Sequence, residues 1–499
     1  MKKQSLRTLI VILGVQLGAH PALADDQAEL IKQLLKRVEE LERTVEALQG
    51  NRDTGTKTNY AIAQQWMQEL DQKVKVLERN RELDQEEKEA KAKEALKISV
   101  DERGFAVGSP DGSNLIKLRG LLQVDSRYFI NDATGNANDS FILRRARPIF
   151  EGTVFRDFDF QFVPEFGGST VQILEANLNY RYSPEAQLRI GKFKSPVGLE
   201  QLQSDPQAMF IERGLPTDLT PNRDLGVQLW GEVGEGVFNY AAGIFNGVGD
   251  NRNASNLDAD DDKEFAGQIF VHPFKKADSF FQGLGLGVAG SYGSQRGVNS
   301  LPASTGGILP GFTTDGQQQF FAYNPTSNAV VVADGLHWRF SPQGYFYRGS
   351  FGVLGEYVIS SQKVHRTVTA PLTTGQIDNK AWQVAVSYVL TGEDASYKGV
   401  TPRRPLGSGG CGALELTGRY AELDVDDDAF PLFSDPATSA ASAHSFTVGL
   451  NWWLNKNIRA TASFSRATFK GGGGAGTTPP TIVTRQPENV VQTRVQISF

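Results

Sequence analysis

Residues 141–162 read Phe-Ile-Leu-Arg-Arg-Ala-Arg-Pro-Ile-Phe-Glu-Gly-Thr-Val-Phe-Arg-Asp-Phe-Asp-Phe-Gln-Phe, and this stretch decides the fold. Successive side chains of a β-strand point to opposite faces, so residues 157–162 place three phenylalanines on one face and polar groups on the other. One apolar face and one polar face are typical of a barrel wall between lipid and water. The same alternation puts Arg145 and Arg147 on one face and Arg144 on the other, unless a β-bulge re-aims it.

A long connection follows two further strands, the second of which ends in Gly-Lys-Phe-Lys at residues 191–194. The next 27 residues, 195–221, reach Pro221 before the strand pattern resumes. Connections of that length are uncommon in compact domains and are usually functional. We expect this loop to fold into the barrel and narrow it, with arginine and lysine side chains lining the narrow part.

The apolar period is two from residue 116 to residue 499, in about sixteen segments. An even number lets a single chain start and finish on the same side of a membrane. Short turns mostly alternate with long polar segments, as in outer-membrane barrels. Residues 391–412 depart from this pattern, being long where a short turn is expected. We therefore predict an all-β fold, a transmembrane antiparallel β-barrel of about 16 strands over residues 115–499.

The last strand alternates in the same way and ends on an aromatic residue, Phe499. A barrel strand with a terminal aromatic resembles the assembly signal of bacterial outer-membrane proteins. The alternative interpretation is the edge strand of a soluble β-sandwich. The single cysteine, Cys411, allows no intramolecular disulfide, and closing a sheet on itself is another way to stabilise an exported protein.

Two features precede the barrel. Residues 1–24 have a basic start, an apolar centre and an Ala-Leu-Ala end, which predict a secretory signal peptide. Residues 25–97 predict a periplasmic coiled-coil helix, because apolar residues recur at spacings of three and four. The β-branched residues of its apolar seam favour a coiled coil of two helices, whereas the trimer discussed below needs three helices. This conflict stays open. Residues 98–114 are expected to be a linker.

The sequence offers little catalytic chemistry. Four histidines remain after signal removal, on different segments, and no G-x-S-x-G, paired-cysteine or H-E-x-x-H motif occurs. We predict no catalytic residue, no cofactor and no metal site. Acidic runs at residues 258–262 and 424–428 offer oxygen ligands for a divalent cation, but solvated loop tips are the preferred interpretation. The net charge of -6 says little about a pore, because acidic loops can outweigh a basic constriction.

Several motifs carry a family resemblance: Lys-Leu-Arg-Gly-Leu-Leu-Gln-Val-Asp at 117–125, Leu-Arg-Arg-Ala at 143–146, Gly-Lys-Phe at 191–193, Gly-Leu-Glu at 198–200, Glu-Arg at 212–213 and Leu-Thr-Gly-Glu at 390–393. With the helical N-terminal segment, they resemble the phosphate-selective porins O and P of Gram-negative outer membranes. The resemblance implies three associated sixteen-stranded barrels, each with its third loop folded inward. It also implies basic side chains that pass phosphate or other anions.

By position, Arg144 and Arg145 match the paired arginines of that family's constriction, and Arg213 matches the arginine of its returning third loop. Lys194 and Arg147 stand where phosphate-selective members carry tyrosines, so the resemblance implies a redistribution of positive charge. Two further departures are Gln201 in place of a lysine and Leu174 in place of an aspartate. Arginine suits this role because it is permanently charged and forms bidentate bonds with oxyanions.

The predicted anion-binding constriction thus consists of five basic residues, with one acidic loop anchor: Arg144, Arg145, Arg147, Lys194, Arg213 and the anchor Glu200. An alternative is that Arg144 and Arg145 only hold the loop, through ion pairs with Glu151, Glu165 or Glu200. For Lys192 and Lys194, solvation at the rim is an equal alternative.

The predicted function is a passive outer-membrane porin with anion preference, for phosphate or a related oxyanion. The alternatives are a porin for another anionic or neutral solute and, in a different class, a barrel enzyme or adhesin. The expected partners are small anions, outer-membrane lipid and lipopolysaccharide, and two further copies in a homotrimer, with no nucleic acid. The expected location is the outer membrane of a Gram-negative bacterium, with the N-terminal helix in the periplasm.

Overall fold

The computed structural model describes residues 36, 40, 43 and 56–499, apart from 133–136, 169, 257, 259, 298–308, 325–329, 367–372, 408 and 475–482. The predicted signal peptide and most of the first apolar repeat lie outside the described residues. The chain divides into two units, Met1–Lys93 and Glu94–Phe499.

The first unit contains a helix, α3 (Thr56–Glu94), of 39 residues. Pairs of opposite charge one turn apart, such as Lys73 with Glu69 and Lys75 with Asp71, support it locally. Val74 and Leu77 of the apolar repeat are 44% and 45% exposed, so the described residues leave these two side chains largely uncovered. Among the described residues, no helix is long and apolar enough to cross a bilayer.

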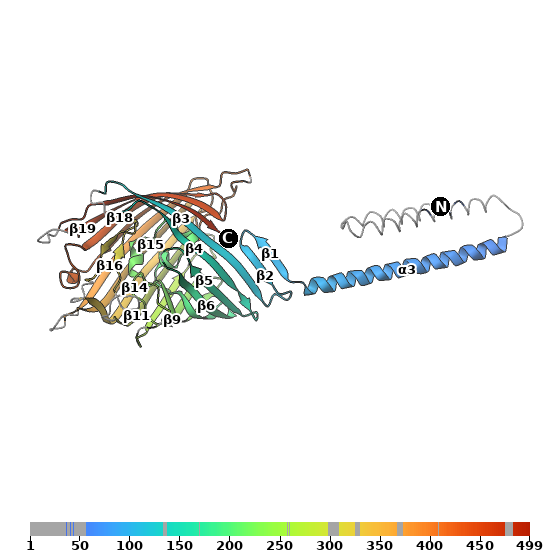
Figure 1. Cartoon of the computed structure of the whole chain (residues 1–499), viewed down its shortest axis with the longest axis horizontal. Helices are drawn as coiled ribbons and strands as arrows, with labels where there is room; N and C mark the ends of the chain where they lie inside the picture. Colours follow the sequence, from blue (N-terminus) through green and yellow to red (C-terminus); the bar gives the residue numbers. More distant parts are fainter. Residues whose placement is uncertain are drawn as a thin grey trace. The chain divides into compact units, whose positions relative to one another are not determined.

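The second unit is a closed antiparallel barrel of sixteen strands, which confirms the barrel part of the predicted fold class (Figure 1). Each strand pairs with the next, and the last pairs with the first, with Val495 opposite Val124. The strands are β3 (Leu115–Phe129), β4 (Ser140–Val154), β5 (Phe158–Glu165), β6 (Gln172–Ser183), β7 (Ala186–Lys194), β8 (Arg223–Val233), β9 (Phe238–Phe245), β10 (Glu264–Val271), β11 (Leu284–Arg296), β14 (Val331–Arg348), β15 (Phe351–Arg366), β16 (Thr373–Val389), β17 (Ala413–Asp424), β18 (Ala440–Trp453), β19 (Ile458–Gly471) and β20 (Glu488–Ser498).

The segment expected as a linker, residues 98–114, is not a plain connection. It contains β2 (Gly104–Gly108) and nearly all of β1 (Lys97–Asp101), which pair with each other, and β2 pairs with the start of β3. The physical reason is a period-two pattern that continues before the barrel, since Ile98, Val100, Phe105 and Val107 alternate with polar or small residues. The barrel sheet therefore begins before residue 115.

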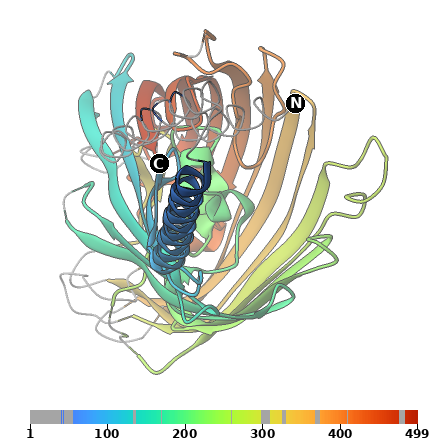
Figure 2. The ribbon, with the colours of Figure 1, turned by 90° about the vertical axis from the view of Figure 1, so that its right-hand side faces the viewer.

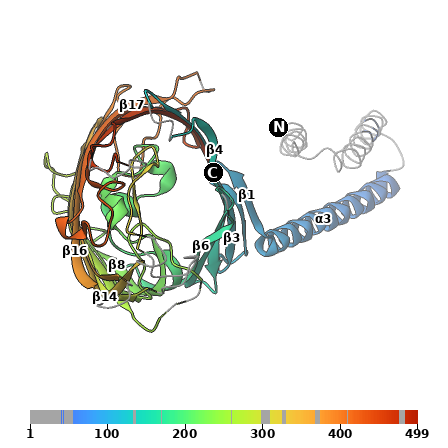
Figure 3. The same cartoon turned by 60° about the vertical axis from the view of Figure 1, so that its left-hand side comes forward.

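Two connections from the long-loop end fold into the barrel. The first, residues 195–222, carries α4 (Leu199–Leu202), η1 (Asp205–Gln207) and η2 (Leu215–Leu219). It forms the green coil inside the ring of strands in Figures 2 and 3. The second, described over residues 309–324, carries the hairpin of β12 (Phe312–Thr313) and β13 (Gln319–Phe321), which the sequence did not predict to turn inward.

A hydrophobic core lies inside the barrel, between these two loops and one part of the wall. Leu219 of η2 and Phe312 of β12 are 0% and 1% exposed. They belong to a cluster with inward residues of β14 to β19, such as Ile377 and Leu423. The core holds the two loops by apolar burial, which is worth about 1.5–3 kcal/mol for each large side chain.

Candidate functional site

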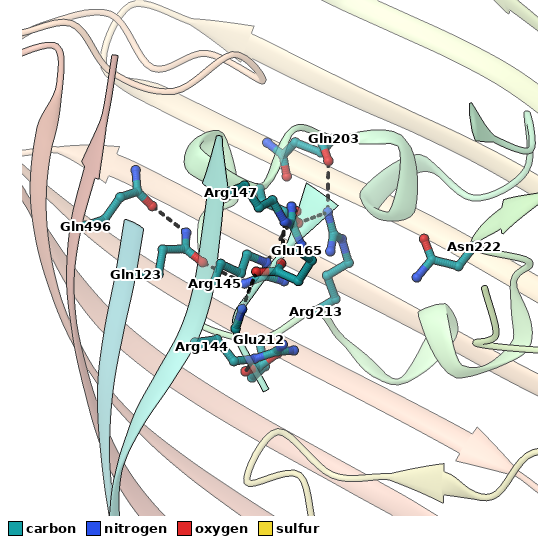
Figure 4. Close-up of polar contacts among 12 residues, drawn as sticks. Gln123, Arg144, Arg145, Arg147, Glu165, Gln203, Glu212, Arg213, Asn222 and Gln496 are labelled. Carbon is teal, nitrogen blue, oxygen red and sulfur yellow. Dashed lines mark hydrogen bonds and ion pairs between the residues drawn. The ribbon is translucent and has the colours of Figure 1, made fainter. Parts of the chain in front are cut away.

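A β-bulge in β4 decides where Arg144 points. Gln123 of β3 pairs with Arg145, and the next residue, Val124, pairs with Leu143, so Arg144 is the extra residue. A bulged residue leaves the strict alternation of the strand. All three arginines of the Arg-Arg-Ala-Arg motif therefore line one cavity. Figure 4 shows their side chains together with those of Glu165, Glu212 and Arg213.

Arg144 forms a two-pronged ion pair with Glu212 of the inward loop. Its Nε donates to Oε1 at 2.7 Å and its Nη2 to Oε2 at 3.0 Å. Arg127 of β3 donates to the same carboxylate at 2.8 Å, and Arg494 of β20 lies 3.8 Å from it. Burial alone raises the pKa of Glu212, but the surrounding guanidiniums, chiefly that of Arg144, hold it below the usual range. Glu212 is therefore ionised and shared by three cations.

A second carboxylate, Asp205, is shared in the same way. Arg145 lies 3.3 Å and Arg213 2.7 Å from its oxygens, and Arg147 also pairs with it. Burial by itself raises the pKa of Asp205, but the three guanidiniums hold that pKa well below its usual range. Arg147 also pairs with Glu165 of β5. Six arginines thus surround two loop carboxylates.

Lys194 does not face an acidic partner in this cluster. Its Nζ donates to the carbonyl oxygens of Gln201 at 2.8 Å and Gln203 at 2.9 Å. Arg213 donates to the Gln203 carbonyl as well, at 2.9 Å, and to that of Glu200 at 3.0 Å. The two cations lie at the carbonyl end of α4, where positive charge is favourable. Lys192 instead donates to the carbonyl oxygen of Ala254 at 2.6 Å.

Glu200 connects the inward loop to the far wall. Its Oε2 accepts from Gln383 of β16 and from the backbone N–H of Gly214, both at 2.8 Å. Its Oε1 accepts from Arg419 of β17 at 3.1 Å. The carboxylate therefore touches two strands and the returning arm of its own loop, the contacts that the predicted anchor would make.

The ion pairs considered as alternatives for Arg144 and Arg145 are formed by other residues. Glu151 pairs with Arg119 at 3.2 Å, and Glu200 pairs with Arg419. Sequence reasoning missed the acidic half of the cluster, Asp205 and Glu212. Glu212 stood in the Glu-Arg motif at 212–213 without a role of its own, and the only signal for Asp205 was its place in the long loop, where no strand alternation applies.

The second inward loop contacts the first inward loop and shares Arg419 with it. Asp315, between β12 and β13, is 2% exposed and accepts from Arg419 at 2.9 Å and from Ser445 at 2.8 Å. The backbone N–H of Thr313 donates to Asp218 of η2 at 2.9 Å. Burial raises the pKa of Asp218 to about 8, so this carboxyl is mainly protonated at neutral pH.

The long connection at the short-turn end, residues 390–412, also touches the first inward loop. Tyr397 stacks on Tyr345 with ring centroids 5.1 Å apart, and its hydroxyl donates to the Leu199 carbonyl at 2.6 Å. Gln203 in turn donates to the Tyr397 carbonyl at 2.7 Å. This departure from the regular turn pattern therefore places a segment of the short-turn end against the first inward loop.

A cavity of about 480 Å³ lies against these groups. Six arginines and three acidic residues line it, so positive charge dominates: Arg127, Arg144, Arg145, Arg147, Arg213, Arg223, Glu165, Glu212 and Asp218. Gln201 and Leu174 line it as well. Four of the six predicted site residues line this cavity: Arg144, Arg145, Arg147 and Arg213. Lys194 and Glu200 do not line it, and their side chains instead bind the inward loop.

A closed barrel with inward loops and a charged interior defines a channel-forming barrel. The chain belongs to the family of phosphate-selective porins O and P, whose pattern matches residues 116–499. It is also similar to an uncharacterized protein of Caulobacter vibrioides, with 24% identity over 355 residues, 64% of this chain and 64% of that relative. The match thus spans less than two thirds of the relative's length.

Solved structures give a weaker likeness. OmpT of Vibrio cholerae has 12% identity and a TM-score of 0.47, with 81% of this chain and 100% of that chain covered. The outer-membrane channel DcaP of Acinetobacter baumannii has 13% identity and a TM-score of 0.48, with 78% and 98% covered. The strand pairing itself defines the barrel, and membership of the family makes it a porin.

Proposed function

We propose that this porin forms a water-filled, anion-preferring channel for the passive uptake of phosphate or related small anions. The observation that carries the proposal is the sharing of two carboxylates, Asp205 and Glu212, by six arginines. Glu165 also pairs with Arg147 and Asp125 with Arg494, so six arginines meet four carboxylates and the cluster keeps an excess of positive charge. Family membership supports a channel rather than an enzyme or adhesin.

The physical basis is the repulsion of cations in a narrow, poorly screened passage. Two unit charges ~4 Å apart interact by about 4 kcal/mol at an effective dielectric near 20, and even a fraction of this sets ion preference. Conduction also needs release, which several moderate sites in series allow better than one deep site. Ion pairing with Asp205 and Glu212 moderates each arginine and so favours release.

The only support for phosphate as the solute is the description of the family. Gln201, where the phosphate-selective members that this sequence resembles carry a lysine, lines the cavity. Leu174 lines it too, where those members carry an aspartate. The proposed solute class is therefore small anions including phosphate, rather than phosphate exclusively.

The assembly belongs to the same proposal. We place the signal peptide at residues 1–24, a periplasmic coiled-coil helix within 25–97, and the barrel in the outer membrane among lipid and lipopolysaccharide as a homotrimer. The exposed apolar seam of α3, at Val74 and Leu77, supports association of helices from different copies. The third loop, residues 195–221, is the constriction.

The test is the ratio of chloride to potassium permeability in a planar bilayer, with phosphate block read from the same membrane. Wild type should prefer chloride. Replacing Arg144, Arg145 and Arg213 together by glutamine should lower the ratio about tenfold and weaken phosphate block, because the fixed charge is lost. The matched control replaces three arginines away from the cavity by glutamine: Arg103, Arg348 and Arg466. A constriction variant with wild-type anion preference would overturn the assignment.

A further inference from the structure

A second cavity, of about 310 Å³, lies at the short-turn end of the barrel, on the inner wall of β3 to β8. The residues that line it lie toward the C-terminal ends of β4, β6 and β8 and toward the N-terminal ends of β3, β5 and β7. None of the residues predicted from sequence to bind anions lines it. It is separate from the arginine cluster of the constriction.

Two cations line this cavity without an ion-pair partner among the residues that the structure describes: Lys117 and Arg189. The Nε of Arg189 is buried and has no hydrogen-bond partner. In the constriction, by contrast, every arginine of the cluster contacts a carboxylate. Glu151 and Asp159 line the cavity too, but their ion pairs are with Arg119 and Arg181 rather than with Lys117 or Arg189.

The carboxylates near these cations are already engaged. Glu151 pairs with Arg119 at 3.2 Å, and Asp159 pairs with Arg181 at 3.2 Å. Asp159 also accepts from the hydroxyl of Thr153 at 2.8 Å. A carboxylate that already accepts hydrogen bonds from a charged donor attracts a second cation less strongly. Arg189 and Lys117 therefore remain able to bind a solute.

Aromatic rings hold Arg189 in place without removing its charge. Its guanidinium carbon lies 4.9 Å from the ring centroid of Trp230 and 5.4 Å from that of Phe193. Cation–π contact fixes the guanidinium plane while its N–H groups stay able to bind an oxyanion. The indole N–H of Trp230 donates to Asn179 at 2.8 Å, and Asn179 donates to Gln187 at 2.9 Å, which fixes the ring.

The remaining lining is neutral and amide-rich, with Gln161 and Asn177 beside Asn179 and Gln187. The cavity thus combines a half-buried indole face, an unpaired guanidinium beside it and amides around both. An inorganic anion uses only the charge. A flat ring that carries a carboxylate uses the charge and the aromatic surface together.

We propose that this cavity is an exit-side subsite for small aromatic carboxylates, with Arg189 and Lys117 binding the carboxylate and Trp230 the ring. The proposal deepens the proposed anion channel and rests on it, because it names a class of organic anion that the channel passes. Such a subsite lowers the free energy of the solute beyond the constriction, and so adds another moderate site in series.

The experiment adds benzoate, acetate or phosphate to the short-turn side of a bilayer that contains the full chain, and measures block of the chloride current. Benzoate should block wild type at a lower concentration than acetate, which has the charge without the ring. Arg189→Gln and Trp230→Leu should each weaken benzoate block about tenfold, the loss of one charge-assisted or stacking contact. Trp230→Phe should retain much of the block, because it keeps a ring.

The matched control is Arg348→Gln. Arg348 also lies over an aromatic ring at the short-turn end, 4.8 Å from the centroid of Phe280, but it does not line the cavity. The Arg348→Gln substitution removes one positive charge and one cation–π contact, as Arg189→Gln does, but outside the cavity. Benzoate block in this variant should therefore equal that of wild type. Equal block in Arg189→Gln and Arg348→Gln would overturn the subsite, as would equal block by benzoate and acetate.

Failure of the subsite and failure of the anion channel are distinguishable. The permeability ratio of wild type against the constriction variant tests the channel alone. If wild type prefers potassium, the anion channel fails, and the subsite is then tested by benzoate quenching of tryptophan fluorescence, compared between wild type and Trp230→Phe. Quenching that is unchanged in Trp230→Phe would overturn the subsite. Resistance of each variant barrel to unfolding on heating in detergent shows that it has folded.

Discussion

The two sides of the barrel interior are built differently. The inner wall of β3 to β8 carries arginines and amides that line open cavities. The inner wall of β14 to β19 carries a cluster of alanine, valine, isoleucine and leucine that packs against the two inward loops, beside polar contacts of Gln383 and Arg419 with the same loops. One side therefore packs against the loops like a protein core, and the other side lines cavities. The apolar side holds the loops where their carboxylates meet the arginines of the charged side.

The largest effect is expected from breaking the apolar side. Phe312→Asp places a charge in a site that is 1% exposed, at a cost of about 4 kcal/mol or more, so both loops should detach from the wall. Single-channel conductance should rise severalfold, because the lumen is no longer filled. Leu432→Asp, at an exposed loop residue of the same end, should leave conductance unchanged. Unchanged conductance in Phe312→Asp would mean that the core does not hold the loops.

A smaller effect is expected from the charged side. Glu212→Gln removes the carboxylate that Arg127, Arg144 and Arg494 share, so the excess of positive charge at the cavity rises. The chloride-to-potassium ratio should increase about threefold, and phosphate should dissociate more slowly. Glu151→Gln, which frees the single Arg119 away from the constriction, is the matched control. An unaltered ratio in Glu212→Gln would show that the paired arginines do not set selectivity.

The smallest effect is a dependence on pH at the junction of the two sides. Asp218 belongs to the loop that packs on the apolar wall, and it lines the charged cavity. Its pKa is about 8, so the carboxyl is neutral below that pH and gains a negative charge as the pH rises through it. Anion preference should therefore fall by less than about twofold between pH 6.5 and pH 9.

Asp218→Asn should remove that fall, because an amide does not ionise. Asp394→Asn, at a side chain that is 77% exposed outside the cavity, should keep it. Permeability ratios measured at the two pH values decide the matter. A fall of equal size in wild type and Asp218→Asn would assign the titration to another group.

The strand pattern made most of the barrel predictable. Period-two alternation, short turns and one long connection are local features, and they led to the sixteen strands and to the long loop that lies inside the barrel. The arginines at 144, 145 and 147 were visible for the same reason, since they lie together in one strand.

The tertiary structure alone decided how those arginines are used. The bulge at Arg144 arises from pairing with β3, a contact that the sequence of β4 does not specify. The carboxylates of Asp205 and Glu212 lie 58 or more residues from their partners Arg147 and Arg144, and their approach depends on the path of an irregular loop. The inward turn of β12 and β13 likewise depends on apolar burial against distant strands. Alternation is a local property of the chain, whereas the pairing of charges inside the barrel is set by contacts between segments that only folding brings together.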